Sequence, residues 1–251
     1  MGDKVGMEKN FIYGIHSVEE ALHSDRAIDK VFVVKGSSNE AIRAIVGLAR
    51  KKQVPYILVP QEKLDRITRK NHQGVICFFS SIEFASLDNV LDATFQRGSD
   101  PVFLMLDGIT DVRNFGAIAR TAECTGIDAI IIPFKGAAQV GPDALKTSSG
   151  ALNHIPVCRV KSLEGTVDFL RTSGLQVVTC TEKTNKEVYD VTFNTPTLIV
   201  MGSEEKGIQG AIRNRADHEV KIPMKGKVGS LNVSVAAGVI LYEMVRQRAQ
   251  Q

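Results

Sequence analysis

Hydrophobic residues in the first 82 positions recur in short runs whose period changes between that of a helix and that of a strand. The pattern predicts helices over residues 16–24, 39–52 and 62–70 and strands over residues 30–36, 55–60 and 74–80. These elements would form a compact α/β unit. Residues 82–100 are acidic, lack a strong period and end in Gly-Ser-Asp-Pro, so we expect a linker there with one helical turn at most.

The rest of the chain has longer strands that are apolar on both faces. They are expected at residues 102–109, 129–133, 176–180 and 197–202, with helices at 114–126, 142–151, 163–174 and 208–216. Continuous apolar strands that alternate with helices are typical of a parallel sheet covered on both faces, so the pattern predicts a doubly wound α/β domain. Ligands of such domains lie beyond the carboxyl ends of the strands, which indicates the loops after Leu106, Thr179 and Met201.

The segment GSLNVSVAAGVILYE, residues 229–243, begins with the alternation of a strand and continues with the spacing of a helix. Gly226 and Gly229 allow a tight turn before it, and from Ser230 onward apolar residues lie on nearly every side of a helix, which predicts burial. Asn232 and Ser234 would each cost about 1 to 3 kcal/mol in such a setting if they were left unpaired. Each therefore needs a protein or ligand partner.

The composition is that of an ordinary globular protein, with 251 residues, 43% hydrophobic and 24% charged. The sequence has neither a run of about 18 apolar residues nor a secretory signal, so we expect a cytoplasmic protein without a membrane span. The net charge is only +3, but residues 1–82 hold 13 Lys and Arg against 9 Asp and Glu. The excess is densest at Arg50, Lys51, Lys52, Lys63, Arg66, Arg69 and Lys70. These residues are a candidate phosphate-binding surface, and the alternative interpretation is an ordinary solvated helix face.

Common catalytic and metal-binding motifs are missing from the sequence. The four cysteines are isolated and form no zinc or redox motif, so we interpret them as buried small hydrophobic residues and expect no metal site. No GxGxxG follows a strand, and neither a P-loop nor a GxSxG elbow is present. An α/β domain without these motifs indicates an unusual cofactor site.

Polar residues near the predicted strand ends are candidates for function. Asn114 stands where a helix N-cap is expected, with Arg120 six residues later, and the alternative is a capped helix with an exposed arginine. Gly202 would allow a ligand to approach the backbone closely. Glu204 follows the strand by two residues and could equally be part of a solvated turn.

Three segments in one order resemble the motifs of the SpoU family, the ribose 2′-O-methyltransferases of the knotted SPOUT class. They are NFGAIARTA, IVMGSEEKGI and IPMKGKVGSLNVSVAAGVILYE. The N-terminal FIYGIHSVEEAL and NHQGVI are similar to the ribosomal-protein-like domain that precedes the catalytic domain in large-subunit rRNA methyltransferases. The resemblance implies an RNA-binding domain at 1–81, a linker at 82–100 and a methyltransferase domain at 101–251.

The resemblance also implies the fold and the ligands of that last domain. Its C-terminal segment would be threaded into a deep trefoil knot, a topology that general folding rules disfavour. S-adenosylmethionine would be held near Thr181, Gly202, Ile222 and Leu231, and the protein would be a homodimer with the site close to the interface. The residues that fall on the family's functional positions are Asn114, Arg120, Glu204, Ser230 and Asn232.

The resemblance implies that the protein transfers a methyl group to a ribose 2′-hydroxyl of RNA. The most specific expectation is a guanosine of 23S rRNA, with either the rRNA or a large-subunit assembly intermediate as the substrate. A tRNA methyltransferase and a non-catalytic RNA-binding protein of the same fold are the alternatives. A guanidinium keeps its proton, so Arg120 is better suited to hold a phosphate and stabilise the developing alkoxide than to act as a base. RNA contacts are expected from the first domain at Arg50, Lys51, Lys52, Arg66, Arg69, Lys70, His72 and Gln73.

Overall fold

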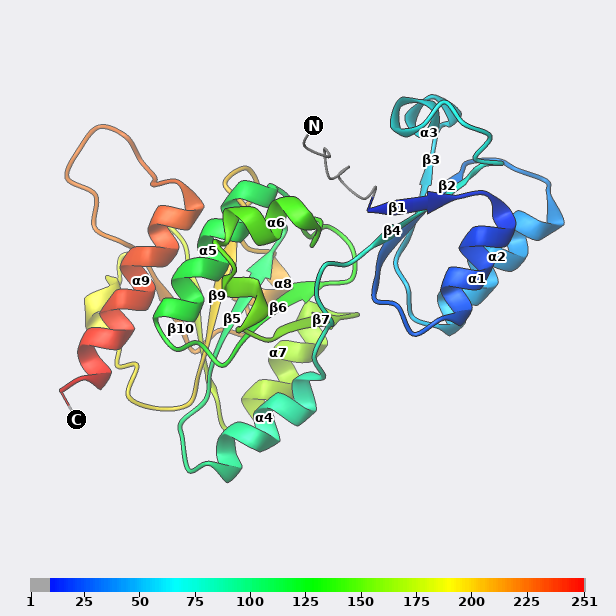
Figure 1. The fold of residues 1–251 in the computed structure, drawn as a ribbon. Coiled ribbons are helices and arrows are strands. Elements are labelled where there is room, and N and C mark those ends of the chain that lie inside the picture. The colour runs from blue at the N-terminus through cyan, green and yellow to red at the C-terminus, as the bar shows by residue number, and fades with distance from the viewer. Residues whose placement is uncertain (1–9, 251) are drawn as a thin grey trace, which may run out of the picture. The chain divides into compact units, whose positions relative to one another are not determined.

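The computed structural model describes residues 10–250, which form two compact units (Figure 1). The first unit ends at Ile82 and includes Val140–Pro142. The second unit contains Glu83–Gln139 and the chain from Asp143 onward. Each unit has its own sheet and its own hydrophobic core.

The first unit is a four-stranded sheet with helices on both faces. The strand order is β1-β4-β2-β3, in which β3 is parallel to β2 and β4 is antiparallel to both its neighbours. The strands are β1 (Phe11–Tyr13), β2 (Ile28–Val34), β3 (Tyr56–Val59) and β4 (Val75–Phe79). The helices are α1 (Ile15–His23), α2 (Glu40–Lys51) and α3 (Gln61–Ile67). Every helix and strand predicted for this unit is present. The strand β1 was not predicted, because three residues are too few to show the period of a strand.

Alternation along the strands of the first unit explains why it has two apolar clusters. Val31 and Val33 pack with α1 and α2, whereas Phe32 packs with Leu64 of α3. Successive side chains of a strand point to opposite faces, so the sheet is apolar on both. The helices α1 and α2 therefore cover one face and α3 covers the other.

The second unit confirms the predicted parallel sheet. Its order is β10-β8-β9-β5-β6-β7, and every neighbouring pair is parallel. The strands are β5 (Val102–Asp107), β6 (Ala129–Pro133), β7 (Val157–Val160), β8 (Gln176–Cys180), β9 (Thr197–Gly202) and β10 (His218–Val220). The helices are α4 (Leu87–Gln96), α5 (Val112–Cys124), α6 (Pro142–Thr147), α7 (Leu163–Thr172), α8 (Gly210–Arg213) and α9 (Val233–Arg248). Two short 3-10 helices, Ala151–Asn153 and Val188–Asp190, complete it.

The central strand β5 is buried along its whole length, as its apolar sequence predicts. Phe103 and Met105 pack in a cluster with residues of α4, α7 and α8. The alternate residues Leu104 and Leu106 therefore point to the other face of the sheet. The helix α5 packs against α9, and α9 also contacts β9. All six strands are parallel, so their carboxyl ends lie along one edge of the sheet.

The expected linker at 82–100 is structured for much of its length. Residues Leu87–Gln96 form α4, whose N-cap Ser86 accepts a hydrogen bond from the Asn89 backbone N–H. Leu87 and Leu91 are one helical turn apart and are buried in the core of the second unit. The expectation of one helical turn was wrong: Leu87, Val90 and Leu91 pack on the same core, but three apolar positions within one turn are too few to show the length of a helix.

The last helix, α9, differs from the prediction in two respects. It begins at Val233 rather than Ser230, and Asn232 is its N-cap. Residues such as Ala237, Ile240 and Leu241 are buried, but Val235 is 52% exposed and Tyr242 is 56% exposed. Thus α9 has an apolar stripe that the rest of residues 10–250 does not cover. The C-terminal knot stays a prediction of the resemblance.

None of the helices within residues 10–250 has the length and apolar character that crossing a membrane requires.

Candidate functional site

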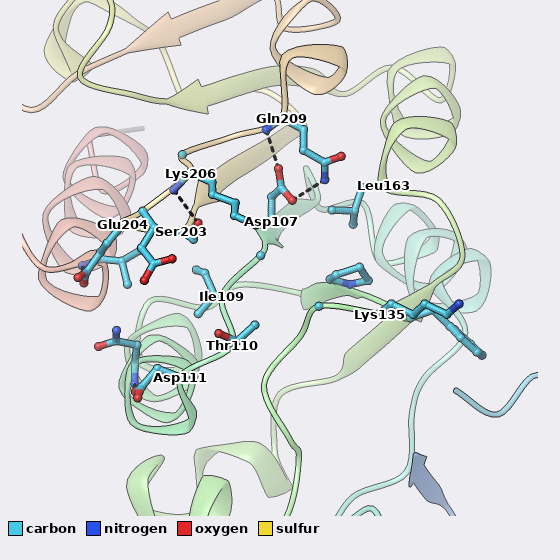
Figure 2. Close-up of a pocket in the computed structure, with 18 of the residues that line it drawn as sticks. Asp107, Ile109, Thr110, Asp111, Lys135, Leu163, Ser203, Glu204, Lys206 and Gln209 are labelled. Carbon is cyan, nitrogen blue, oxygen red and sulfur yellow. Dashed lines mark hydrogen bonds between the residues drawn. The ribbon is translucent and has the colours of Figure 1, made fainter. Parts of the chain in front are cut away.

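Two cavities lie at the carboxyl edge of the six-stranded sheet. The smaller cavity, of about 400 Å³, lies beyond β8, β9 and β10 and reaches the start of α9. The larger cavity, of about 1030 Å³, lies beyond β9, β5, β6 and β7 (Figure 2). The turn Ser203–Gly207 lines both and forms the wall between them. The loops after Leu106, Thr179 and Met201, predicted as the place for ligands, all contribute to these cavities.

The smaller cavity brings together every residue predicted to hold the cofactor. Thr181, Gly202, Ile222 and Leu231 all line it, although they come from four separate segments of the chain. Ser230, predicted as catalytic, lines the same cavity.

Asn232 is the centre of a hydrogen-bond network at the start of α9. Its Nδ2 group donates to Asn114 Oδ1 at 3.1 Å and to Glu204 Oε1 at 2.8 Å. Its Oδ1 accepts from the Ser234 backbone N–H at 3.0 Å and from the Ser234 hydroxyl at 2.5 Å. Both hydrogens and both lone pairs of the amide are therefore used. The predicted need for partners at Asn232 and Ser234 is met within the protein, and three predicted catalytic residues are joined.

Glu204 binds the first turn of α9. Its Oε1 also accepts a hydrogen bond from the Val233 backbone N–H at 3.0 Å. A carboxylate is stabilised at this position because the N-terminal N–H groups of a helix lack partners within the helix. The same contact orients the carboxylate, so Glu204 does not behave as a residue of a free surface turn.

Asn114 is not the N-cap of α5, contrary to the prediction. Asp111 has that role, and its Oδ1 accepts from the Asn114 backbone N–H at 2.8 Å. Asp and Asn are equally good N-caps, so the sequence alone did not separate the two positions. Because Asn114 is inside the first turn, its side chain is available to bind Asn232.

Two polar atoms of this network have no partner among residues 10–250. These are Asn114 Nδ2, a donor, and Glu204 Oε2, an acceptor. Both residues line the larger cavity, and Figure 2 shows Glu204 at its edge. A hydroxyl group can accept from one and donate to the other, so the pair is chemically suited to hold a sugar.

Arg120 is on α5 but is not brought to this network. It is exposed, lines neither cavity and makes no hydrogen bond or ion pair with the part of the chain that the structure describes. Residues six apart on a helix point in different directions, so Arg120 and Asn114 do not share a face. Within one chain, the five predicted catalytic residues are thus separated into the joined group Asn114, Glu204 and Asn232, the cavity-lining Ser230, and the distant Arg120.

Gly202 is required by the protein backbone itself. A Cβ atom at this position would lie 2.2 Å from the Gly207 carbonyl carbon and 2.4 Å from the Ile208 nitrogen. This crowding arises because Ser203 and Gly207 form a bridge, in which the Gly207 N–H donates to the Ser203 carbonyl at 2.8 Å. The glycine therefore allows the wall between the two cavities to fold, a reason that the sequence prediction did not identify.

Asp107 and Gln209 form a contact that the sequence reasoning missed. Gln209 donates to the Asp107 carboxylate from its backbone N–H and from its side-chain amide, both at 2.7 Å (Figure 2). Asp107 is only 4% exposed and both of its oxygens are bound. The pair links the end of β5 to the segment after the wall between the cavities. The sequence feature that could have indicated this contact was Asp107 itself, a carboxylate directly at the end of a buried strand.

The cysteines differ in environment. Cys77 and Cys158 are buried as predicted, but Cys124 is exposed on α5, where the prediction was wrong. Cys180 lines the smaller cavity, and burial raises the pKa of its thiol to about 12. A thiol is a poor nucleophile until it loses its proton, so we expect Cys180 to react more slowly than an ordinary thiol at neutral pH. No cluster of His, Cys, Asp and Glu suited to a metal ion occurs in the described chain.

Seven of the eight predicted RNA-binding residues are exposed on the first unit: Arg50, Lys51, Lys52, Arg66, Arg69, Lys70 and Gln73. His72 is buried instead, with Nε2 2.9 Å from Asp65 Oδ1 and Nδ1 accepting from the Gly74 N–H at 3.0 Å. Gln73 Oε1 accepts from the Ile15 N–H at 2.9 Å. The side chains of His72 and Gln73 therefore stabilise the turn before β4. The six exposed cations form two groups, residues 50–52 at the end of α2 and residues 66–70 at the end of α3, and these helices cover opposite faces of the sheet.

Family models match both parts of the chain. The model described as the SpoU rRNA Methylase family matches residues 101–242. The model described as RNA 2′-O ribose methyltransferase substrate binding matches residues 11–85.

Similar proteins extend over nearly the whole chain. YacO from Bacillus subtilis, named as a TrmH family tRNA/rRNA methyltransferase, is 34% identical over 97% of this chain and 98% of its own length. A Staphylococcus epidermidis protein of the same family name is 36% identical over 97% and 98%. The SpoU methyltransferase AviRb from Streptomyces viridochromogenes, solved with AdoMet, has a TM-score of 0.61 and 26% identity over 96% of this chain and 91% of its own. The A. aeolicus TrmH/SpoU tRNA modifying enzyme has a TM-score of 0.56 and 27% identity, covering 64% of this chain and 85% of its own.

Proposed function

Because the chain belongs to the SpoU rRNA Methylase family, we propose that it methylates the ribose 2′-hydroxyl of a guanosine in 23S rRNA. It is a TrmH/SpoU family tRNA/rRNA methyltransferase, and its methyl donor is S-adenosylmethionine. The observation that supports ribose as the acceptor is the Asn114–Asn232–Glu204 network, which presents one donor and one acceptor to the larger cavity.

The smaller cavity fits S-adenosylmethionine. Its volume of about 400 Å³ lies within the range of about 300 to 1,000 Å³ that is usual for small-molecule sites. Apolar residues such as Leu231 and Ile240 line it together with polar groups such as Thr181 and Ser230. When bound, the cofactor supplies an electrophilic methyl group. Burial keeps the Cys180 thiol protonated, so this cavity residue does not compete with RNA for that methyl group.

The residues of the network would position the ribose. Glu204 Oε2 accepts a hydrogen bond from a ribose hydroxyl, and Asn114 Nδ2 donates to a ribose oxygen. Asn232 holds both side chains in place through its hydrogen bonds of 3.1 and 2.8 Å. Correct alignment of the attacking oxygen is a large part of the catalysis of such displacement reactions. Ser230, at the border of the smaller cavity, contributes a further hydroxyl.

Arg120 would act from a second copy of the chain. In one chain it is exposed and outside both cavities, so it needs another surface to become part of a site. The apolar stripe of α9, with Val235 52% and Tyr242 56% exposed, is a suitable homodimer interface, and α5 packs beside α9. At the partner's site, the guanidinium would hold an RNA phosphate and stabilise the developing alkoxide, while the proton leaves to phosphate or water.

Two observations favour rRNA over tRNA. The chain has a unit of its own that matches the substrate-binding model, and its exposed surface carries the six basic residues. The tRNA-modifying structures, by contrast, cover 64% and 61% of this chain, which is less than both units together. The first unit would therefore select the RNA and the second would perform the chemistry.

The test of this proposal is a map of 2′-O-methyl groups across rRNA and tRNA from cells with and without the protein. We expect one guanosine methyl group of 23S rRNA to disappear and to return when the purified protein is added to RNA or ribosomal particles with cofactor. Loss of a methyl group from tRNA instead would show that the substrate is tRNA and not rRNA. Calorimetric titration with S-adenosylmethionine that shows no binding, with or without RNA, would indicate a non-catalytic RNA-binding protein.

The homodimer is tested by sedimentation of the full chain and of a Tyr242→Asp variant. We expect a dimer for the natural sequence and a monomer for the variant, because a charge would have to be desolvated in the interface. A natural chain that sediments as a monomer at micromolar concentration contradicts the dimer.

A further inference from the structure

The larger cavity extends well beyond the residues that hold the ribose. From Glu204 it runs past the end of β5 to the loops after β6 and β7, where Lys135 and Lys161 line it. Figure 2 shows Lys135 on the opposite side of the cavity from Glu204. Its volume of about 1030 Å³ is at the upper limit for small-molecule sites, so it has room for more than one nucleoside.

The two ends of this cavity differ in charge. At the near end the carboxylates of Asp111, Glu204 and Glu205 outnumber the one cation, Lys206, so this end repels a phosphate. At the far end lie Lys135 and Lys161, both exposed, with Glu164 as the acidic neighbour. A nucleic acid strand carries one phosphate per nucleotide, so its phosphate groups favour the far end.

The sheet brings the two lysines close together. Pro133 at the end of β6 pairs with Val160 at the end of β7, and the Phe134 N–H donates to the Val160 carbonyl at 2.8 Å. Lys135 and Lys161 follow directly after these paired residues. Neighbouring strands are about 4.8 Å apart, which is close enough for two ammonium groups to bind one phosphodiester.

We propose that the larger cavity is the path of the RNA strand, and that Lys135 and Lys161 bind the phosphodiester of a nucleotide next to the methylated one. The proposal rests on the proposed function and adds two substrate-positioning residues to it. The ribose lies at the Asn114, Glu204 and Asn232 end. Base edges lie over the middle of the cavity, and the phosphate lies between the two lysines.

The experiment compares four full-length proteins: the natural chain, Lys135→Ala/Lys161→Ala, Lys135→Arg/Lys161→Arg, and Lys146→Ala. Lys146 is an exposed lysine of α6 that does not line the cavity, so it is the matched control. Binding of deproteinised 23S rRNA from cells lacking the protein, and of tRNA as a second probe, is measured by filter retention at several salt concentrations. The kcat and the KM for RNA, and the affinity for S-adenosylmethionine, are measured in parallel.

We expect the double alanine variant to raise the KM for RNA about tenfold and to lower the slope of log affinity against log salt by about 0.7, the contribution of one lost phosphate contact of a single strand. Its affinity for S-adenosylmethionine should stay within twofold, because neither lysine lines the smaller cavity. The double arginine variant should retain the natural KM, and Lys146→Ala should match the natural chain.

A double alanine variant with the natural KM and the natural salt slope overturns the proposal. A loss shared equally by Lys146→Ala also overturns it, because the effect would then follow net charge. Binding does not require methyl transfer, so the salt slope tests the lysines even if the natural chain methylates neither RNA. Such a failure of methylation would count against the proposed function alone.

Discussion

Replacing Asn232 by aspartate removes one donor group from the network and keeps the shape of the side chain. Asp is as good an N-cap as Asn, so the variant keeps the hydrogen bond to the Ser234 N–H and the start of α9. It loses the Nδ2 group that now donates to Glu204 and Asn114. A carboxylate oxygen would then face the Glu204 Oε1 at the former hydrogen-bond distance of 2.8 Å.

The repulsion between the two carboxylates can be bounded from that distance. Two unit charges at 2.8 Å repel by about 1.5 kcal/mol at the dielectric constant of water and by about 6 kcal/mol at an effective value of 20. Both residues are exposed, so the lower value is the better guide. The pair relieves this repulsion by taking up one proton as the pH falls, and the shared proton restores a donor between the oxygens.

We therefore expect Asn232→Asp to be inactive at pH 8 and to recover part of its methyl transfer as the pH falls, whereas the natural chain shows no such gain. Asn232→Ala is the matched variant, because it loses the cap and the donor together. It should reduce the free energy of unfolding by about 2 kcal/mol, from about 1 kcal/mol for the cap and about 1 kcal/mol for the remaining hydrogen bonds. It should stay inactive at every pH.

The measurements are urea unfolding and incorporation of labelled methyl groups between pH 5 and 9. Full activity of Asn232→Asp at pH 8 would refute the role of the amide as a donor that orients Glu204. Equal destabilisation of the aspartate and alanine variants would refute the role of the side chain as the cap of α9.

Three further predictions concern other parts of the site. Arg120→Ala should lower methyl transfer about a hundredfold or more while changing cofactor affinity only a few fold, and loss of both would instead make Arg120 a support of the cavity. Gly202→Ala should destabilise the fold by about 1 to 3 kcal/mol in urea unfolding, because backbone atoms occupy the space of its Cβ, whereas Gly210→Ala meets no atom within 4 Å and should not. Burial raises the pKa of Cys180 to about 12, so iodoacetamide at pH 8 should label exposed Cys124 and spare Cys180, as peptide mass spectrometry can check; equal labelling of the folded protein would contradict this.

The elements that the sequence predicted well are those whose period is complete within the element. The strand β5 is apolar at every position and is buried throughout, and α2 repeats Ile42, Ile45 and Ala49 on one buried face. The strands β1, β7 and β10 have only three or four residues and no full pattern, so they became visible only through their pairing with neighbours. Local sequence also did not decide between Asp111 and Asn114 as the cap of α5, because both residue types satisfy the same backbone N–H groups.

The candidate site was predictable in its members and less so in its contacts. The resemblance identified Asn114, Glu204 and Asn232, which the fold brings together from positions up to 118 residues apart. It did not reveal the link between Asp107 and Gln209, since a pair 102 residues apart has no local signal. Nor did periodicity reveal that one stripe of α9 is exposed. An apolar stripe that is exposed in the single chain has the same kind of sequence as one that the chain itself covers.

The cap of α9 also determines when the Asn114–Asn232–Glu204 network can assemble during synthesis of the chain. Asn114 leaves the ribosome well before α9 does, but Asn232, its link to Glu204, is fixed only when Val233 and the following residues form the helix. A ribosome adds about 5 to 20 residues per second, so the last helix follows Asn114 by several seconds or more. If the network holds the ribose as proposed, a nascent chain therefore lacks an assembled site until α9 has docked.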